Sequence, residues 1–200
     1  MFNSHKQPAT CVHYNATAEK RGKNDFVPAG DLKLKMIVPN TVLDEFGPDY
    51  RTFLYSKANA RAVTRDKDAP DQAELIPAPE DGLTALAHPM LEPLRLREKF
   101  TGYYLSIATE LGLSEPLIFD DVTLSGFVFK ALDGGSLELT FHARVLEMSP
   151  EDSGSMHFLS RQSVLLTLEP PGAAPQQADI EDPDQAGGDT LDHQDAAAAA

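Results

Sequence analysis

The chain lacks the features that define several protein classes. Its 200 residues contain a single cysteine, Cys11, which excludes an internal disulfide framework and a zinc site built from several cysteines. No stretch approaches the ~18 consecutive apolar residues of a membrane span. The first residues, MFNSHKQPATC, contain no apolar segment of a secretory signal. These absences predict a cytoplasmic protein with no membrane partner.

The motifs of catalysis and phosphate binding are missing as well. The sequence has no GxSxG, no GxGxxG and no GxxxxGK followed by Ser or Thr, and no histidine stands in an HExxH arrangement. Asp120 and Asp121 are adjacent, and neighbouring strand residues point to opposite faces, so their carboxylates do not converge. A bulge or turn between Phe119 and Val122 explains this pair. We therefore predict neither an enzyme nor a bound metal or cofactor.

Basic residues are missing from the end of the chain. The sequence holds 31 acidic and 17 basic residues, for a net charge of −14, and its last basic residue is Arg161. Residues 170–200 are rich in Pro, Gly, Ala, Gln and Asp and carry two aliphatic side chains larger than Ala. Such a segment cannot bury enough apolar surface to offset its ordering entropy. We predict that 170–200 forms a disordered acidic tail.

Alternation of apolar and polar residues predicts β-strands in much of the remaining chain. Within residues 31–39, Leu32, Leu34 and Met36 lie on one face and two lysines on the other, as in a half-buried strand. Two alternating segments that flank the Gly-rich turn at 133–135 predict a hairpin. Further strands are predicted within 91–111, 116–133, 136–148 and 162–170.

Two helical segments and a loop interrupt the predicted strands. Apolar residues at helical spacing predict a short helical hairpin over 41–54, and 150–161 predicts a short helix or turn. Residues 57–82 contain several prolines without a period and predict a long loop. The sum is a mainly β (β-rich α+β) domain over 25–169: an antiparallel barrel, with an OB-like barrel as one candidate, or a sandwich. Residues 1–24 are expected to supply an edge segment that is partly flexible.

One pattern combines basic and aromatic side chains. Arg95, Arg97 and Lys99 repeat with a period of two, so they share one strand face. Positive charge follows a phosphate backbone, and an aromatic ring stacks on an unpaired base. The competing interpretation is an ordinary solvated strand face. The predicted nucleic-acid-binding residues are Arg95, Arg97, Lys99, Tyr103, Tyr104, Lys20, Arg21 and Lys23.

Two stretches of the chain resemble a family of uncharacterised proteins from tailed bacteriophages and prophages. The first is EKRGKNDFVPAGDLKLKMIVPNTVLDEFGPDYRTFLY, and the second is FTGYYLSIATELGLSEPLIFDDVTLSGFVFKALDGGSLELTFHARV. The shared features are a charged RGK turn, VPA, the DLKL strand, the helical hairpin and a terminal β-meander, over about residues 15–168. The resemblance implies a role in DNA recombination or replication in a bacterial host cell. It assigns no functional residue, because it includes no catalytic motif.

These observations leave two functional hypotheses. In the first, a phage accessory protein binds single-stranded DNA without sequence preference, and its acidic tail competes for the binding groove or recruits a partner such as a phage recombinase. In the second, the net charge of −14 marks an acidic interaction protein, such as a DNA-mimicking inhibitor of a host defence or nucleic-acid enzyme. In either case open sheet edges allow a homo-oligomer through edge pairing.

Overall fold

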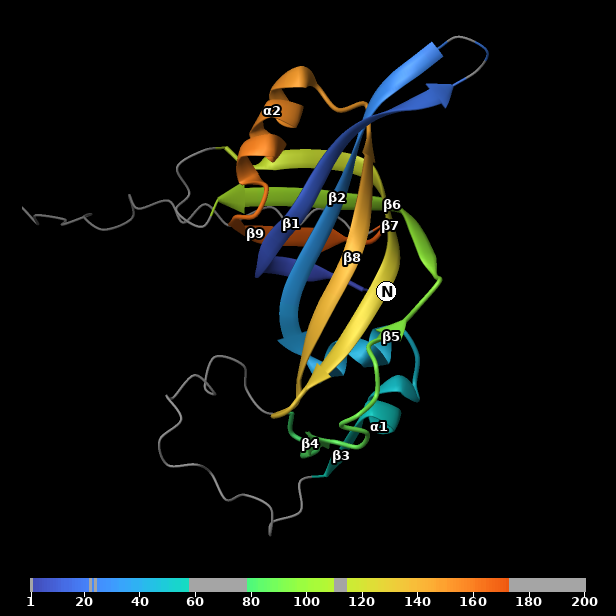
Figure 1. Cartoon of the computed structure of the whole chain (residues 1–200), viewed down its shortest axis with the longest axis vertical. Coiled ribbons are helices and arrows are strands. Elements are labelled where there is room, and N and C mark those ends of the chain that lie inside the picture. The colour runs from blue at the N-terminus through green and yellow to red at the C-terminus, as the bar shows by residue number, and fades with distance from the viewer. Residues whose placement is uncertain (1, 22, 24, 58–78, 110–114, 173–200) are drawn as a thin grey trace, which may run out of the picture.

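The protein folds as a closed antiparallel β-barrel of six strands (Figure 1). The computed structural model describes residues 2–21, 23, 25–57, 79–109 and 115–172. The barrel strands follow the order β7-β6-β9-β1-β2-β8, and pairing of β8 with β7 closes the ring. The strands are β1 (Ser4–Arg21), β2 (Asp25–Pro39), β6 (Lys99–Thr109), β7 (Leu117–Leu132), β8 (Ser136–Leu146) and β9 (Ser163–Glu169).

The barrel confirms the predicted mainly β fold and decides between its alternatives. A sandwich would have left two separate sheets, whereas here one sheet closes on itself. The six strands are one more than the five of an OB-fold. The predicted loop over 57–82 and the predicted tail over 170–200 lie mostly outside the described residues, which omit 58–78 and 173–200.

The predicted alternation matches the burial of the strands. In β8, Leu137, Leu139, Phe141, Ala143 and Val145 all point into the core. In β2 the inward side chains are Leu32, Leu34, Met36 and Val38. Because each strand sends every second residue inward, the outward faces keep the charged side chains, and the barrel interior fills with aliphatic and aromatic groups.

The predicted helical hairpin is confirmed and closes one end of the barrel. It consists of the 3-10 helix η1 (Asn40–Glu45) and the helix α1 (Tyr50–Leu54). They are followed by the two-stranded sheet of β3 (Tyr55–Lys57) and β4 (Leu83–Leu86). The Phe46 ring packs against Phe127 and Phe129, with centroids 5.1 and 4.9 Å away. Asn40, which has no exposed surface, donates to the Leu83 carbonyl at 2.7 Å and so ties the hairpin to β4.

The helix α2 (Pro150–Leu159) lies near the other end of the barrel (Figure 1). Ser149 caps this helix by accepting a hydrogen bond from the Asp152 amide at 3.0 Å. Met156 and Leu159 point into the core. The predicted short helix over 150–161 is therefore confirmed, and it connects β8 to β9.

The prediction that residues 1–24 form an edge segment is wrong. β1 lies between β2 and β9 and pairs with both, because Ala9, Cys11 and Tyr14 supply buried side chains to the core. Past the barrel rim, β1 and β2 continue as a two-stranded ribbon, drawn in blue at the upper right of Figure 1. We call residues 18–21 and 25–28 of this ribbon the arm.

Candidate nucleic-acid interface

The structure confirms that Arg95, Arg97 and Lys99, which we call the basic stripe, lie on an exposed face. The short strand β5 (Leu94–Arg95) pairs with β7, where Arg95 lies opposite Val128. Leu94, Leu96 and Phe100 pack against the core, whereas Arg95, Arg97 and Lys99 are exposed. None of these three cations forms an ion pair with another described residue. Their charges are therefore available to an anionic partner.

Tyr103 does not belong to this stripe, and its prediction as a stacking residue is wrong. A bulge at Gly102, which has a φ of +78°, shifts the register with β7 between Phe100 and Tyr103 and reverses the side on which the following residues lie. Only 1% of the Tyr103 surface is exposed. Burial and the charge of Glu45 raise the pKa of its hydroxyl. A base cannot reach this ring.

Tyr104 faces outward but lies beside carboxylates. It is half-buried and pairs across the sheet with Glu169. Burial raises the pKa of Tyr104, and the charges of Glu169 and Asp120 raise it further. Neighbouring negative charges repel phosphate, so Tyr104 is poorly placed to stack a nucleic-acid base. Its side chain is therefore not part of the basic surface.

The bulge predicted between Phe119 and Val122 is confirmed. Asp121 has a φ of +53°, and the pairing of β6 with β7 shifts register at this point. The Asp120 and Asp121 side chains are both exposed. The pair therefore lies at a bulge that bends β7, and both carboxylates face solvent instead of opposite sides of the sheet.

The remaining predicted residues, Lys20, Arg21 and Lys23, are exposed on the arm and at its tip. They are not close to the stripe at Arg95, because the arm and β5 leave the barrel at different places (Figure 1). Arg21 forms an ion pair with Glu147, with 2.9 Å between Nη1 and Oε1. The eight predicted residues thus do not form one continuous surface.

A different basic surface comes from the register of the barrel. One outward row crosses five strands through His13, Lys33, His142, Ser125 and Lys99, each paired with the next. The adjacent outward row runs through Thr10, Lys35, Thr140, Val128 and Arg95. Neither row contains a carboxylate. We call the lysine, arginine and histidine side chains of these rows, together with Arg97, the basic belt: His13, Lys33, Lys35, Arg95, Arg97, Lys99 and His142.

Carboxylates lie on both sides of the two rows, and the exposed Glu98 stands between Arg97 and Lys99 in the chain. On one side, Arg144 forms ion pairs with both Glu19 and Asp31, at 3.1 Å each. On the other side, Glu138 lies 3.4 Å from the Lys35 ammonium group, the one belt cation with such a partner among the described residues. Lys33 and Lys99 are separated by three strand spacings of about 4.8 Å, which is more than the Debye length of ~8 Å at physiological salt. The belt therefore has two local groups of positive charge, one on β2 and one at β5 and the start of β6.

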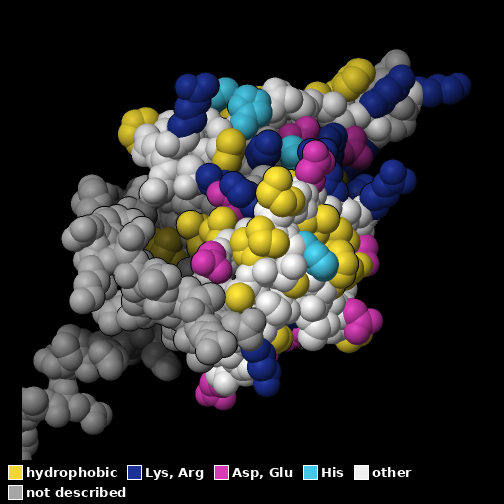
Figure 2. All heavy atoms as spheres, turned by 60° about the horizontal axis from the view of Figure 1, so that its bottom comes forward, with side chains coloured by type: hydrophobic (Ala, Val, Ile, Leu, Met, Phe, Trp, Pro, Cys, Tyr) yellow, Lys and Arg dark blue, Asp and Glu magenta, His cyan; other side chains and the backbone are white. Residues whose placement is uncertain are grey.

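Sequence reasoning missed the basic belt for a specific reason. The lysines of DLKLKM were visible as the polar face of a strand, but nothing in the sequence brings Lys33 and Lys99 into one row. In Figure 2 most Lys, Arg and His side chains lie in the upper part of the view, and hydrophobic side chains gather in its middle. Several Asp and Glu side chains lie among them in that part of the view.

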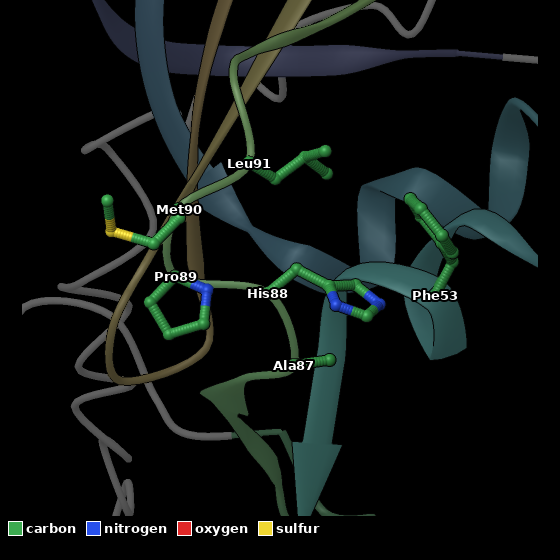
Figure 3. A pocket seen from close by; sticks show the side chains of 6 residues that line it. All are labelled: Phe53, Ala87, His88, Pro89, Met90 and Leu91. Carbon is green, nitrogen blue, oxygen red and sulfur yellow. The ribbon is translucent and has the colours of Figure 1, made fainter.

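The protein surface also contains a shallow, largely apolar hollow of about 460 Å³ (Figure 3). Its lining consists of Phe53, Ala87, His88, Pro89, Met90 and Leu91. The His88 ring points towards Phe53, with 5.1 Å between the centroids, and the Met90 side chain points the other way. The lining contains no carboxylate, hydroxyl or thiol. It therefore offers no nucleophile or acid–base pair for catalysis.

Other chemistry is sparse in the described part of the chain. Within it no group of three or more His, Cys, Asp or Glu side chains is arranged to hold a metal ion. Cys11 is fully buried on β1, and burial raises the pKa of its thiol. A buried thiol with a raised pKa is unreactive. No helix among the described residues has the length and apolar character needed to cross a membrane.

The fold and its surface define the protein as a closed six-stranded antiparallel barrel with a basic belt on its outer face. Comparisons of the chain with protein-family models, with curated proteins and with solved structures found no match. We therefore infer a function from the geometry of the chain itself.

Proposed function

We propose that this protein binds single-stranded DNA without sequence preference and that the basic belt is its binding surface. The observation that supports the proposal is the pair of adjacent outward rows that contain six cations and imidazoles and no carboxylate. Phosphates along a nucleic-acid backbone bind such a surface by displacing counterions. The net charge of −14 does not oppose this, because local clustering decides where a polyanion binds.

The composition of the belt also accounts for a lack of sequence preference. Lysine and arginine side chains that contact phosphates position a strand but do not identify its bases. The belt offers no exposed tyrosine, because Tyr103 is buried and Tyr104 lies among carboxylates. Binding should therefore be dominated by electrostatics and should weaken steeply with salt.

We place this activity in phage DNA recombination or replication. The placement depends on the resemblance of residues 15–168 to phage and prophage proteins. In such a role, a single-strand-binding accessory protein would work with a phage recombinase. The same belt would then hold displaced or resected single strands while the partner acts on them. The partner surface would lie elsewhere on the chain.

Fluorescence anisotropy with labelled oligo-dT tests the proposal directly. If about four phosphate contacts form, a fourfold rise in salt should weaken binding by about 50-fold. The double variant Lys33→Glu/Lys99→Glu should lose most of the affinity, because it reverses the charge at two positions of one belt row. Lys57→Glu is the matched control, since Lys57 is an exposed lysine on β3, outside the barrel sheet.

Two results would contradict the proposal. If the Lys33→Glu/Lys99→Glu variant binds as tightly as the Lys57→Glu control, the belt is not the binding surface. If the unmodified protein does not bind oligo-dT at low salt, the single-strand-binding function is wrong. In that case the second hypothesis, an acidic interaction protein, is favoured, and a protein partner with a basic groove should be recovered by pull-down from host lysate.

A further inference from the structure

The two faces of the arm differ in how their charges are paired. On one face, Glu19 accepts from the Arg144 Nε at 3.1 Å, and Arg21 donates to Glu147 at 2.9 Å. Each of these charged groups on the arm thus has a partner at the rim of the barrel. The paired face is nearly neutral and offers little to a charged ligand.

The opposite face of the arm carries an uncovered aromatic ring beside an unpaired cation. Phe26 lies directly across the ribbon from Lys20, and 65% of its surface is exposed. Lys20 has no ion pair or hydrogen bond with another described residue. The next cross-strand pair on this face is Ala18 with Pro28, two small exposed residues that leave the ring accessible. The result is a flat apolar surface with a positive charge at its edge.

We infer that this face of the arm, formed by Phe26 and Lys20, is a stacking platform for an unpaired base of the bound single strand. Any nucleic-acid base has a flat face that can stack on a phenyl ring, and the Lys20 ammonium group can contact the adjoining phosphate. The inference rests on the proposed function and adds the aromatic contact that the basic belt lacks. The inference also gives the exposed Phe26 ring a function. A two-stranded ribbon is only marginally stable in water by itself.

Lys20 lies seven residues along β1 from His13 of the belt, about 23 Å at the usual rise of ~3.3 Å per strand residue. Because seven is an odd number, the platform is on the opposite face of the ribbon from the belt, and one strand contacts both by passing over the edge of the ribbon. Barrels of the OB type cover roughly 4–16 nucleotides of single strand. A labelled oligo-dT of about 30 nucleotides therefore exceeds a usual site and can reach the arm from the belt.

The composition of the chain provides a direct optical test. The sequence contains no tryptophan, so the variant Phe26→Trp has a single indole at the platform. We expect saturating oligo-dT to quench its fluorescence, because a stacked base quenches indole emission. The matched control is Phe158→Trp, which places the indole on α2 at a side chain that is 73% exposed and should show little quenching. Phe26→Ala should weaken binding about tenfold with an unchanged salt dependence, because it removes no phosphate contact.

The outcomes separate this inference from the function on which it rests. If the unmodified protein binds oligo-dT by anisotropy but the Phe26→Trp emission does not change and Phe26→Ala binds normally, the platform is wrong and the belt stands. If Phe26→Trp emission changes with protein concentration and not with oligo-dT, the face contacts a second copy of the chain, which also overturns the platform. If the unmodified protein does not bind at all, both proposals fail together.

Discussion

Lys33 on β2 and Lys99 on β6 occupy the same outward row of the barrel, joined through His142 and Ser125. Two intervening strands separate them in space, and the whole hairpin, loop and β5 region separates them in sequence. Their alignment depends on closure of the sheet between β7 and β8. The surface proposed to bind nucleic acid is thus a property of the barrel and does not exist in any one strand.

The exposed arginines beside β5 should contribute to the affinity and to its salt dependence. Replacing both, in Arg95→Ala/Arg97→Ala, removes up to two phosphate contacts without disturbing Leu94 and Leu96, which pack on the core. The slope of log affinity against log salt should fall by about 1.4 for single-stranded DNA. Salt titrations by anisotropy measure this slope. Tyr103→Phe is the control, because the buried ring should leave binding unchanged. Equal slopes for the arginine variant and the unmodified protein would remove these arginines from the site.

The acidic end of the chain should weaken binding. Residues 173–200 hold seven of the 31 acidic residues and no lysine or arginine, so a chain of residues 1–172 carries a charge of −7 in place of −14. It keeps every described helix and strand. We expect it to bind oligo-dT several-fold more tightly at low salt, with the difference vanishing at high salt, because charge repulsion is screened. A full-length control with the seven acids changed to Asn and Gln separates charge from length. Identical affinities at low salt would show that the tail does not compete.

Local patterns predicted the elements of this fold better than its closure. The alternation at Leu137, Leu139 and Phe141 fixed the inward face of β8, and the helical spacing over 41–54 predicted η1 and α1. Closure depends on pairings between distant strands such as β1 with β9, and no local pattern encodes those. For that reason residues 1–24 were expected at an edge although β1 has neighbours on both sides.

The predicted site was only partly correct, because a single backbone bulge changes which face of β6 the following side chains point to. Period-two counting from Arg95 through Lys99 places Tyr103 on the exposed face. Gly102 adds one residue to β6 relative to β7, and every later side chain changes sides. A glycine between Thr101 and Tyr103 was the available signal, since glycine within a strand often marks a bulge.

The bulge at Gly102 should be sensitive to a side chain. Its φ of +78° suits glycine, and an added Cβ would approach Pro171 at only an ordinary contact distance of 3.4 Å. Gly102→Ala should therefore destabilise the protein through backbone strain, by about 1–2 kcal/mol. Gly154→Ala is the matched control, because Gly154 lies in α2 with open space around its Cβ position. That change should stabilise the protein by about 0.5–1 kcal/mol. Urea unfolding measures both, and equal effects of the two changes would contradict the argument.

The stability of the barrel should fall at alkaline pH because of Tyr55. Its hydroxyl donates to the Ser136 carbonyl and accepts from the Leu132 amide at 3.3 Å, and its ring is buried. Burial, with a smaller contribution from the Asp133 charge, raises the pKa of Tyr55 to about 12 from an ordinary value of 10.0. The folded chain therefore keeps a proton that the unfolded chain loses between these values. Unfolding free energy should be constant below pH 10 as far as Tyr55 is concerned. It should fall by up to about 2–3 kcal/mol as the pH rises towards 12.

The variant Tyr55→Phe isolates this contribution. It cannot ionise, so its unfolding free energy should decrease less steeply than that of the unmodified protein over the same pH range. A residual decrease is expected, because burial raises the pKa values of Tyr103 and Tyr104 as well. At neutral pH the variant should be less stable by about 1 kcal/mol, since the Ser136 carbonyl loses its donor. Urea unfolding followed by circular dichroism at several pH values measures both effects. Parallel pH profiles for the two proteins would show that Tyr55 titrates normally and that the hydroxyl does not secure β3 to the hairpin of β7 and β8.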